Sequence, residues 1–219
     1  MVLRIAFLVM FGSCVGSAQV RATIVPSTGE EVSSKAGNQW SLTGSTLKRA
    51  IGELFEVTTA HIDLPAELDD GRTYDFTVEV PAAKRGNMTS LMEQAIEKQF
   101  RVSIVREHRL MDVYVLTAPS GHGKLLSSYL GGEGSSIRIQ NSGLQAHAID
   151  LRMLSEALES PLALGRPVID ETHLTGHYDI SVRGIGRGPE ALVQSLQECG
   201  IVALPEKRNV ELVVVRPNP

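Results

Sequence analysis

One alternating segment occurs twice in this chain, and this limits the folds that the chain can adopt. Residues 74–78 read Tyr-Asp-Phe-Thr-Val, and residues 178–182 read Tyr-Asp-Ile-Ser-Val. In both, a Tyr-Asp pair opens a run with a period of two, which is typical of a strand with one buried face. The two segments lie 104 residues apart. A chain that uses one strand pattern twice at this distance is expected to contain two similar units.

Two further pairs of segments support the repeat. Leu47-Lys48 and Leu151-Arg152 are also 104 residues apart, and Glu107-x-Arg109 returns as Glu206-x-Arg208 after 99 residues. Nearly constant spacing over three anchors indicates internal duplication. The period of the apolar residues changes from two to that of a helix in the same order in both halves. The expected fold class is therefore α+β, with two similar β-α-β-β-α-β-β units, each a small mixed sheet with two helices on one face.

Helix caps and turns set the expected element ends. Ser45 is placed to cap the first helix of the first unit, and Asp150 the first helix of the second. Each unit is expected to close with a hairpin. The charged runs REHRLM (106–111) and PEKRN (205–209) would form the two turns, because solvated turns are the usual place for such runs.

These patterns divide the chain into five expected segments. They are a signal peptide (1–18), an N-terminal strand with a mobile stretch (19–38), a first α+β unit (39–118), a Gly/Ser-rich linker (119–136) and a second α+β unit (137–217).

The N-terminus has the pattern of a secretory signal. Arg4 precedes an apolar run from Ile5 to Phe11, and small residues follow up to Ala18. The run is too short for a membrane anchor, and no transmembrane helix is expected in the mature chain. Cleavage after Ala18 predicts an exported protein of the periplasm or the extracellular space. Two alternatives are a lipidated Cys14 and a buried N-terminal strand or helix.

Composition argues against some functions. The net charge is −4 and the charges are mixed along the chain, so no basic stripe is available for phosphate backbones and nucleic acid is not expected as a partner. After cleavage the chain would retain only Cys199, which precludes an internal disulfide. Cys199 closes an apolar helical pattern, so it is interpreted as a small buried hydrophobe and not as a nucleophile.

Two motifs offer chemistry at first sight. Asp170, Glu171, His173 and His177 are residue types that bind metals, but Gly176 and the strand after it place them on a turn instead of on one helical face. The glycines of RGIGRGPE (183–190) resemble a phosphate-binding loop but lack the third glycine and the downstream acid. A structural turn and a flexible connector are the preferred interpretations. No catalytic residue, cofactor site or metal site is assigned.

The residues singled out are therefore structural. In the second unit, short polar side chains are expected to bond nearby backbone, and Gly176 is expected to supply an unusual φ. The expected structural residues are Asp170, Thr172, Leu174, Thr175, Gly176, Tyr178 and Asp179, with Tyr74 and Asp75 in the first unit.

The chain resembles a soil-associated family of exported bacterial proteins of unknown function. The segment 165–182 matches the signature Gly-Arg-Pro-Val-x-Asp-x-Thr-x-Leu-Thr-Gly-x-Tyr-Asp, and TLKRAIGELFEV (46–57) resembles the first helix of the family. His173 and His177 stand where the family often has Gly and Arg. In some relatives the domain is fused to membrane metallopeptidase-type sensors, which implies sensing or docking. The order of elements also resembles the short N-terminal domain of secretins and TonB-dependent receptors, which binds protein partners.

The expected function follows from these points. The chain is interpreted as a non-catalytic, exported interaction or sensing module with an envelope protein as its partner. The alternatives are an envelope hydrolase and a small-ligand binding protein, each with a site between the two units.

Overall fold

The computed structural model describes residues 7–10, 20–119, 127–128 and 134–218. The chain divides into two compact units, one formed by residues 1–107 and 212–219 and the other by residues 108–211. The predicted signal peptide lies outside the described residues except for 7–10, and most of the predicted linker does too. Among the helices of the described part, none has the length and apolar character needed to cross a membrane.

The main sheet of the first unit has five antiparallel strands in the order β1-β2-β6-β4-β3. Two α-helices and two 3-10 turns accompany it, together with the short strand β5. The bounds are β1 (Phe7–Met10), β2 (Arg21–Pro26), β3 (Val32–Ala36), β4 (Gln39–Thr46), α1 (Leu47–Phe55), η1 (Thr59–His61), β5 (Ile62–Asp63), β6 (Thr73–Glu79), η2 (Ala82–Asn87) and α2 (Met88–Phe100).

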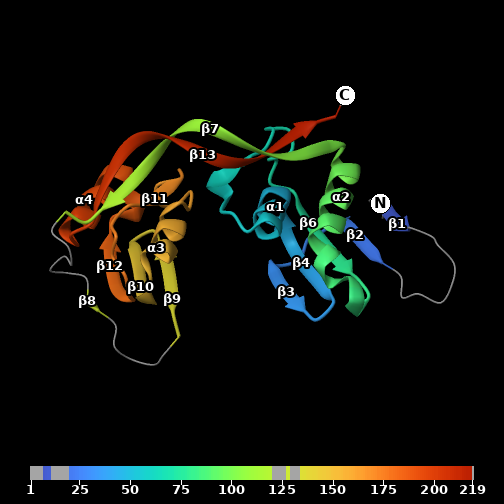
Figure 1. Cartoon of the computed structure of the whole chain (residues 1–219), viewed down its shortest axis with the longest axis horizontal. Helices are drawn as coiled ribbons and strands as arrows, with labels where there is room; N and C mark the ends of the chain where they lie inside the picture. Colours follow the sequence, from blue (N-terminus) through green and yellow to red (C-terminus); the bar gives the residue numbers. More distant parts are fainter. Residues whose placement is uncertain (1–6, 11–19, 120–126, 129–133, 219) are drawn as a thin grey trace. The chain divides into compact units, whose positions relative to one another are not determined.

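Both helices of the first unit cover the same face of this sheet (Figure 1). Phe76 and Val78 of β6 are buried, while Thr77 between them points to the other face, as a period of two requires. The buried strand residues form one core with Ile51 of α1 and Ile96 of α2. These two helices leave the opposite face of the sheet uncovered.

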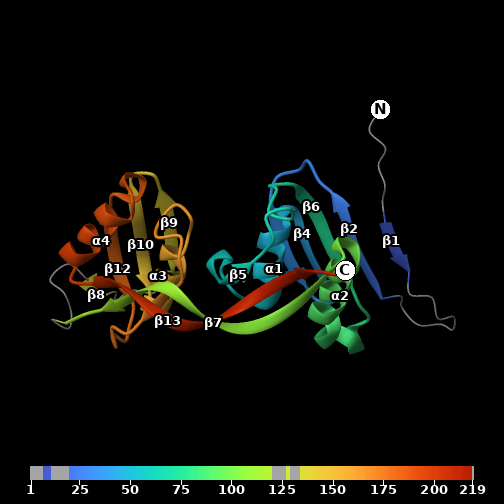
Figure 2. The same cartoon turned by 90° about the horizontal axis from the view of Figure 1, so that it is seen from above.

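The second unit repeats this arrangement. Its main sheet has the order β8-β12-β10-β9 and is antiparallel, and Figure 2 shows β9, β10 and β12 side by side. The bounds are β8 (Ser127–Ser128), β9 (Ser136–Gln140), β10 (Gly143–Ile149), α3 (Leu151–Leu158), β11 (Val168–Asp170), β12 (Tyr178–Arg183), η3 (Ile185–Arg187) and α4 (Pro189–Glu198). Its core joins Ile180 and Val182 of β12 to Leu154 of α3 and Leu192 of α4. The strand order matches β2-β6-β4-β3 of the first unit, element for element.

The two closing hairpins predicted from the sequence are wrong. β7 runs without interruption over Val102–Thr117, and β13 over Val202–Pro217. The run 106–111 contains no Gly, Pro or Asn, and its side chains continue the alternation between the two faces of the strand. In 205–209, Pro205 lies in β13 outside the residues that pair with β5, and proline is tolerated in a strand that has one edge unpaired.

The two long strands form a third sheet, with the order β11-β7-β13-β5. Each long strand crosses from one unit to the other, because the unit boundaries fall after Glu107 in β7 and after Glu211 in β13. In the second unit β11 pairs in parallel with β7, and in the first unit β5 pairs in parallel with β13. The predicted α+β class is confirmed. The strands occupy more sheets than predicted, because the closing strands pair with each other and leave the main sheets purely antiparallel.

Candidate functional site

The repeated Tyr-Asp pair holds the same backbone irregularity in both units. Asp75 accepts a hydrogen bond from the Gly44 N–H at 2.9 Å, and Asp179 accepts one from the Ala148 N–H at 3.0 Å. Gly44 and Ala148 have φ values of 61° and 52°. The pairing register shifts at both positions, so each is part of a β-bulge. The Asp of each pair therefore clamps a bulge on the neighbouring strand.

Each bulge is followed two residues later by a helix cap. Thr46 Oγ1 accepts from the Arg49 N–H at 3.3 Å, and Asp150 Oδ1 accepts from the Met153 N–H at 2.7 Å. The predicted cap Asp150 is confirmed. The predicted cap Ser45 is wrong: its buried hydroxyl donates to Glu31 Oε2 at 3.2 Å, and the bulge moves the cap to the next residue. Clamp, bulge and cap together set the angle at which the first helix leaves the sheet.

The two tyrosines lie differently in their units. The Tyr74 ring packs edge-on against Phe100 at a centroid distance of 5.2 Å. The Tyr178 ring is 1% exposed, and its hydroxyl donates to the carbonyl oxygen of Thr175 at 2.9 Å. Tyr178 thereby ties the end of the preceding loop to the core of the second unit.

The loop before Tyr178 is built from local hydrogen bonds. Asp170 Oδ1 accepts from both the backbone N–H and the hydroxyl of Thr172, at 2.9 and 2.6 Å, and Thr172 Oγ1 accepts from the Leu174 N–H at 3.2 Å. These are Asx and ST turns, which short polar side chains favour. Positive φ values occur at His173 (56°) and Gly176 (115°). Leu174 packs against the core of the second unit. This geometry is that of a structural turn.

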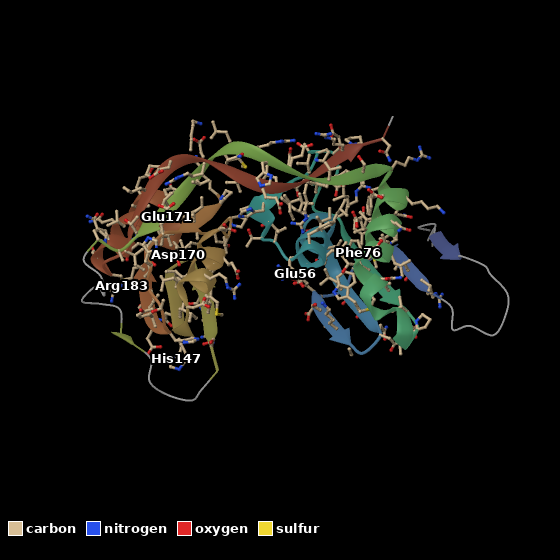
Figure 3. The ribbon with its side chains drawn as sticks, in the orientation of Figure 1. Glu56, Phe76, His147, Asp170, Glu171 and Arg183 are labelled. Carbon is tan, nitrogen blue, oxygen red and sulfur yellow. The ribbon has the colours of Figure 1, made fainter. Side chains whose placement is uncertain are left out.

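One acid of this loop and one histidine of β10 form ion pairs or close contacts elsewhere in the unit. Glu171 pairs with Arg208 at 3.4 Å, and His147 Nδ1 lies 2.8 Å from Asp179 Oδ1. In the part of the chain that the structure describes, no three metal-binding side chains come together. Figure 3 labels Asp170 and Glu171 where β11 ends and His147 on β10, which belongs to the main sheet of the same unit.

The predicted flexible connector 183–190 is an ordered turn. Gly184 and Gly186 donate backbone hydrogen bonds to the carbonyl oxygens of Ser142 and Asn141, at 3.2 and 2.8 Å. Ile185–Arg187 forms a 3-10 turn, and Pro189 begins α4. The glycines allow close approach, since a Cβ at Gly186 would lie 2.7 Å from Asn141 O. The loop is bound to the turn between β9 and β10.

The outer edge of β12 is closed from within the unit. Among the described residues, β8 pairs with Tyr178 and Asp179 of β12. Farther along, the Arg183 N–H donates to Ser195 Oγ at 2.9 Å, and Cys199 Sγ lies 3.5 Å from the Ser181 carbonyl oxygen. Both partners come from one face of α4 and its end. In the first unit the corresponding edge, that of β6, is paired over its whole length with β2.

Cys199 thus helps to close the outer edge of β12, a role that the sequence did not indicate. Burial raises the pKa of its thiol above the usual range, and the neighbouring Glu198 carboxylate raises it further. The thiol therefore keeps its proton and can donate it to the Ser181 carbonyl. Ser195 and Cys199 are four residues apart on a helix and so lie on one face of it. This spacing is the sequence feature that could have indicated their shared role at the edge of β12.

The outer edges of β3 and β9 remain open. Among the described residues, β3 pairs only with β4, and β9 only with β10. All five residues of β3 are exposed. In antiparallel pairs, residues of the non-hydrogen-bonded positions turn their N–H and C=O groups away from the partner strand. The two-residue turns at the ends of these hairpins assign that position to Ser33 and Lys35 of β3 and to Ile137 and Ile139 of β9.

The fold and these edges define an α+β protein with two units of one strand order, each with an open edge strand. Comparison with known families then places the chain. It belongs to the family described as "Protein of unknown function (DUF3738)", whose model matches residues 48–215. Neither a curated protein nor a solved structure matched the chain.

Proposed function

We propose that this chain is an exported interaction module of the cell envelope, built from two copies of one unit, which binds a protein partner by strand addition to the outer edge of β3. The observation that carries the proposal is this edge, a five-residue exposed strand with one side that no other described strand pairs with. An extended partner segment would gain main-chain hydrogen bonds along it. The sequence pattern of the N-terminus supports export, and the resemblance to soil-associated exported proteins agrees with it.

The partner segment is expected to carry an acidic residue. Lys35 is the one charged residue of β3, and a lysine on an edge strand disfavours indiscriminate pairing. A carboxylate on the added strand, opposite or diagonal to Lys35, would pair with the lysine charge and offset the unfavourable free energy of placing that charge against another strand. The same strand is therefore expected to favour an acidic segment over a neutral one.

Signal cleavage would open a further edge. Phe7–Met10 pair with Arg21–Ile24 of β2, and the four residues of β1 lie within the predicted signal peptide. Removing them leaves the outer edge of β2 unpaired in the mature protein. This edge lies at the opposite side of the same sheet from β3.

Site-specific photocrosslinking in the native host tests the proposal. A photoreactive amino acid at Lys35 is expected to give one discrete adduct with a second protein. Ser33→Pro, which removes an outward N–H from the same edge, is expected to abolish that adduct. The matched control is the same amino acid at Gln99, an exposed position on α2. Equal adducts from both positions, or an adduct that survives Ser33→Pro, would contradict docking at β3.

A further inference from the structure

The second unit has a polar hollow on the face of its sheet that α3 and α4 leave uncovered. The hollow has a volume of about 270 Å³. Its lining comes from β9, β10, β12 and the turn between β9 and β10, namely Arg138, Gln140, Ser142, Gly143, Gln145, Ser181, Val182 and Arg183. All of these residues belong to one unit. The hollow is distinct from the open outer edge of β9.

The strand register explains why a hollow forms here. Arg138, Gln145 and Ser181 make one row across the three strands, and Gln140, Gly143 and Arg183 make the next. Gly143 has no side chain at the centre of the second row. A Cβ there would overlap the Val182 carbonyl oxygen, so the position cannot hold a larger residue without a backbone shift. The gap is therefore built into the sheet.

Two arginines flank the gap from opposite corners. With strands about 4.8 Å apart and residues about 3.3 Å apart along a strand, the Cα atoms of Arg138 and Arg183 are separated by about 12 Å. Two extended arginine side chains can converge across such a span on one small ligand. Figure 3 marks Arg183 on β12.

Within the described residues, the positive charge of the hollow is not balanced by a nearby acid. Among the described residues that line it, none is acidic. Within the same described part of the chain, neither Arg138 nor Arg183 forms an ion pair. The nearest acid along β12, Asp179, is occupied by the Ala148 N–H and by His147. Guanidinium groups bind carboxylate and phosphate in a bidentate manner. Besides Gly143 and Val182, the rest of the lining consists of amide and hydroxyl side chains, which suit hydroxyl groups.

The first unit provides an internal comparison. The residues 104 positions earlier have the same register, with Ser34, Ser41 and Thr77 in one row and Ala36, Gln39 and Glu79 in the next. There, serine and glutamate replace the two arginines, and glutamine replaces the glycine. The two units share one strand order, but only the second has the two arginines and the glycine that make the hollow cationic and open.

We infer that this hollow of the second unit binds a sugar that carries an anionic group, a carboxylate or a phosphate, with Arg138 and Arg183 on the anion and Gln140, Gln145 and Ser181 on the hydroxyl groups. This site does not depend on strand addition at β3, and either could exist without the other.

Isothermal titration with three sugars and acetate tests the inference. D-glucuronate, glucose 6-phosphate or both are expected to bind the purified protein, and the tighter one identifies the anion. Glucose and acetate are expected to bind at least about tenfold more weakly, because each lacks one half of the recognised chemistry. Equal binding of acetate and glucuronate, or no binding of either sugar anion, would overturn the inference.

Single substitutions test whether the sugar anion binds in this hollow. Arg138→Ser, which installs the residue of the first unit, and Arg183→Gln are each expected to weaken the sugar anion at least about tenfold. Arg187→Gln removes an equal charge from the exposed turn beside the hollow and is expected to leave affinity unchanged. An equal loss in Arg187→Gln would show that net charge alone attracts the ligand and would contradict the site. Unchanged thermal unfolding midpoints show that the variants keep their fold.

Discussion

Exchanging the two bulge residues tests how the repeated Asp clamps work. Gly44 and Ala148 occupy the same place in their units, with φ values of 61° and 52°. A Cβ at Gly44 would lie 2.5 Å from the carbonyl oxygens of Gly29 and Glu30. Gly44→Ala therefore adds both the cost of a left-handed alanine and a steric overlap with backbone. Ala148→Gly removes the left-handed strain that the second unit already tolerates.

The expected magnitudes differ widely. The left-handed conformation costs an alanine about 1–2 kcal/mol, and overpacking against rigid atoms adds about 1–3 kcal/mol. Gly44→Ala should thus lower the free energy of unfolding by about 2–5 kcal/mol. For Ala148→Gly, the relief of about 1–2 kcal/mol is offset by a glycine entropy cost of about 0.5–1 kcal/mol. Its stability should therefore stay within about 1.5 kcal/mol of the parent.

Urea and thermal unfolding followed by circular dichroism measure both changes. For a chain of this size, about 1 kcal/mol shifts the thermal midpoint by about 2–4 °C, so Gly44→Ala should lower it by about 4–20 °C. Two results would contradict the steric argument for the two bulges: equal destabilisation by both substitutions, or a Gly44→Ala variant whose unfolding free energy equals that of the parent.

Three further predictions concern single positions. Tyr178→Phe should cost about 0.5–1.5 kcal/mol of unfolding free energy through loss of the hydrogen bond to Thr175, and an unchanged urea midpoint would contradict this bond. Cys199→Ala should destabilise by about 1–2 kcal/mol and Cys199→Ser by less, because serine keeps a donor for the Ser181 carbonyl. The pKa of the Cys199 thiol is raised in the folded state. The thiol therefore contributes its full stabilisation below the ordinary pKa of 9.0 and loses it as the pH rises through the folded pKa. The difference in unfolding free energy between Cys199→Ala and the parent should accordingly shrink in alkali. N-terminal sequencing of protein from the native host should return a chain that starts at or near Gln19, whereas an intact Met1 would contradict export by cleavage.

The sequence predicted the main elements because each has a strong local pattern. The strands that begin at Tyr74 and Tyr178 alternate cleanly, and the helices after residues 46 and 150 have regular apolar faces. The repeat of the Tyr-Asp pair was enough to indicate two α+β units. The role of the Asp did not follow from the sequence, because its partner is a backbone N–H 31 residues away.

The missed features depend on long-range pairing. The charged runs of β7 and β13 resemble turns in isolation, but ion pairs stabilise them within strands, such as Lys207 with Asp112 at 2.9 Å and Arg216 with Glu107. Whether a strand edge is open depends on its neighbours in space. β2 and the Ser195–Cys199 pair cover edges that local patterns would leave free, while β3 and β9 keep theirs.

Hydrogen exchange of the β3 amides, with and without the crosslinked partner, tests strand addition at this edge. In the free protein, the outward amides of Ser33 and Lys35 should exchange rapidly, while the Ser34 amide, bonded to β4, exchanges slowly. With the purified partner added, Ser33 and Lys35 should become protected and Ser34 should change little. A partner that binds with full affinity while Ser33 and Lys35 continue to exchange rapidly would contradict docking by strand addition to this edge.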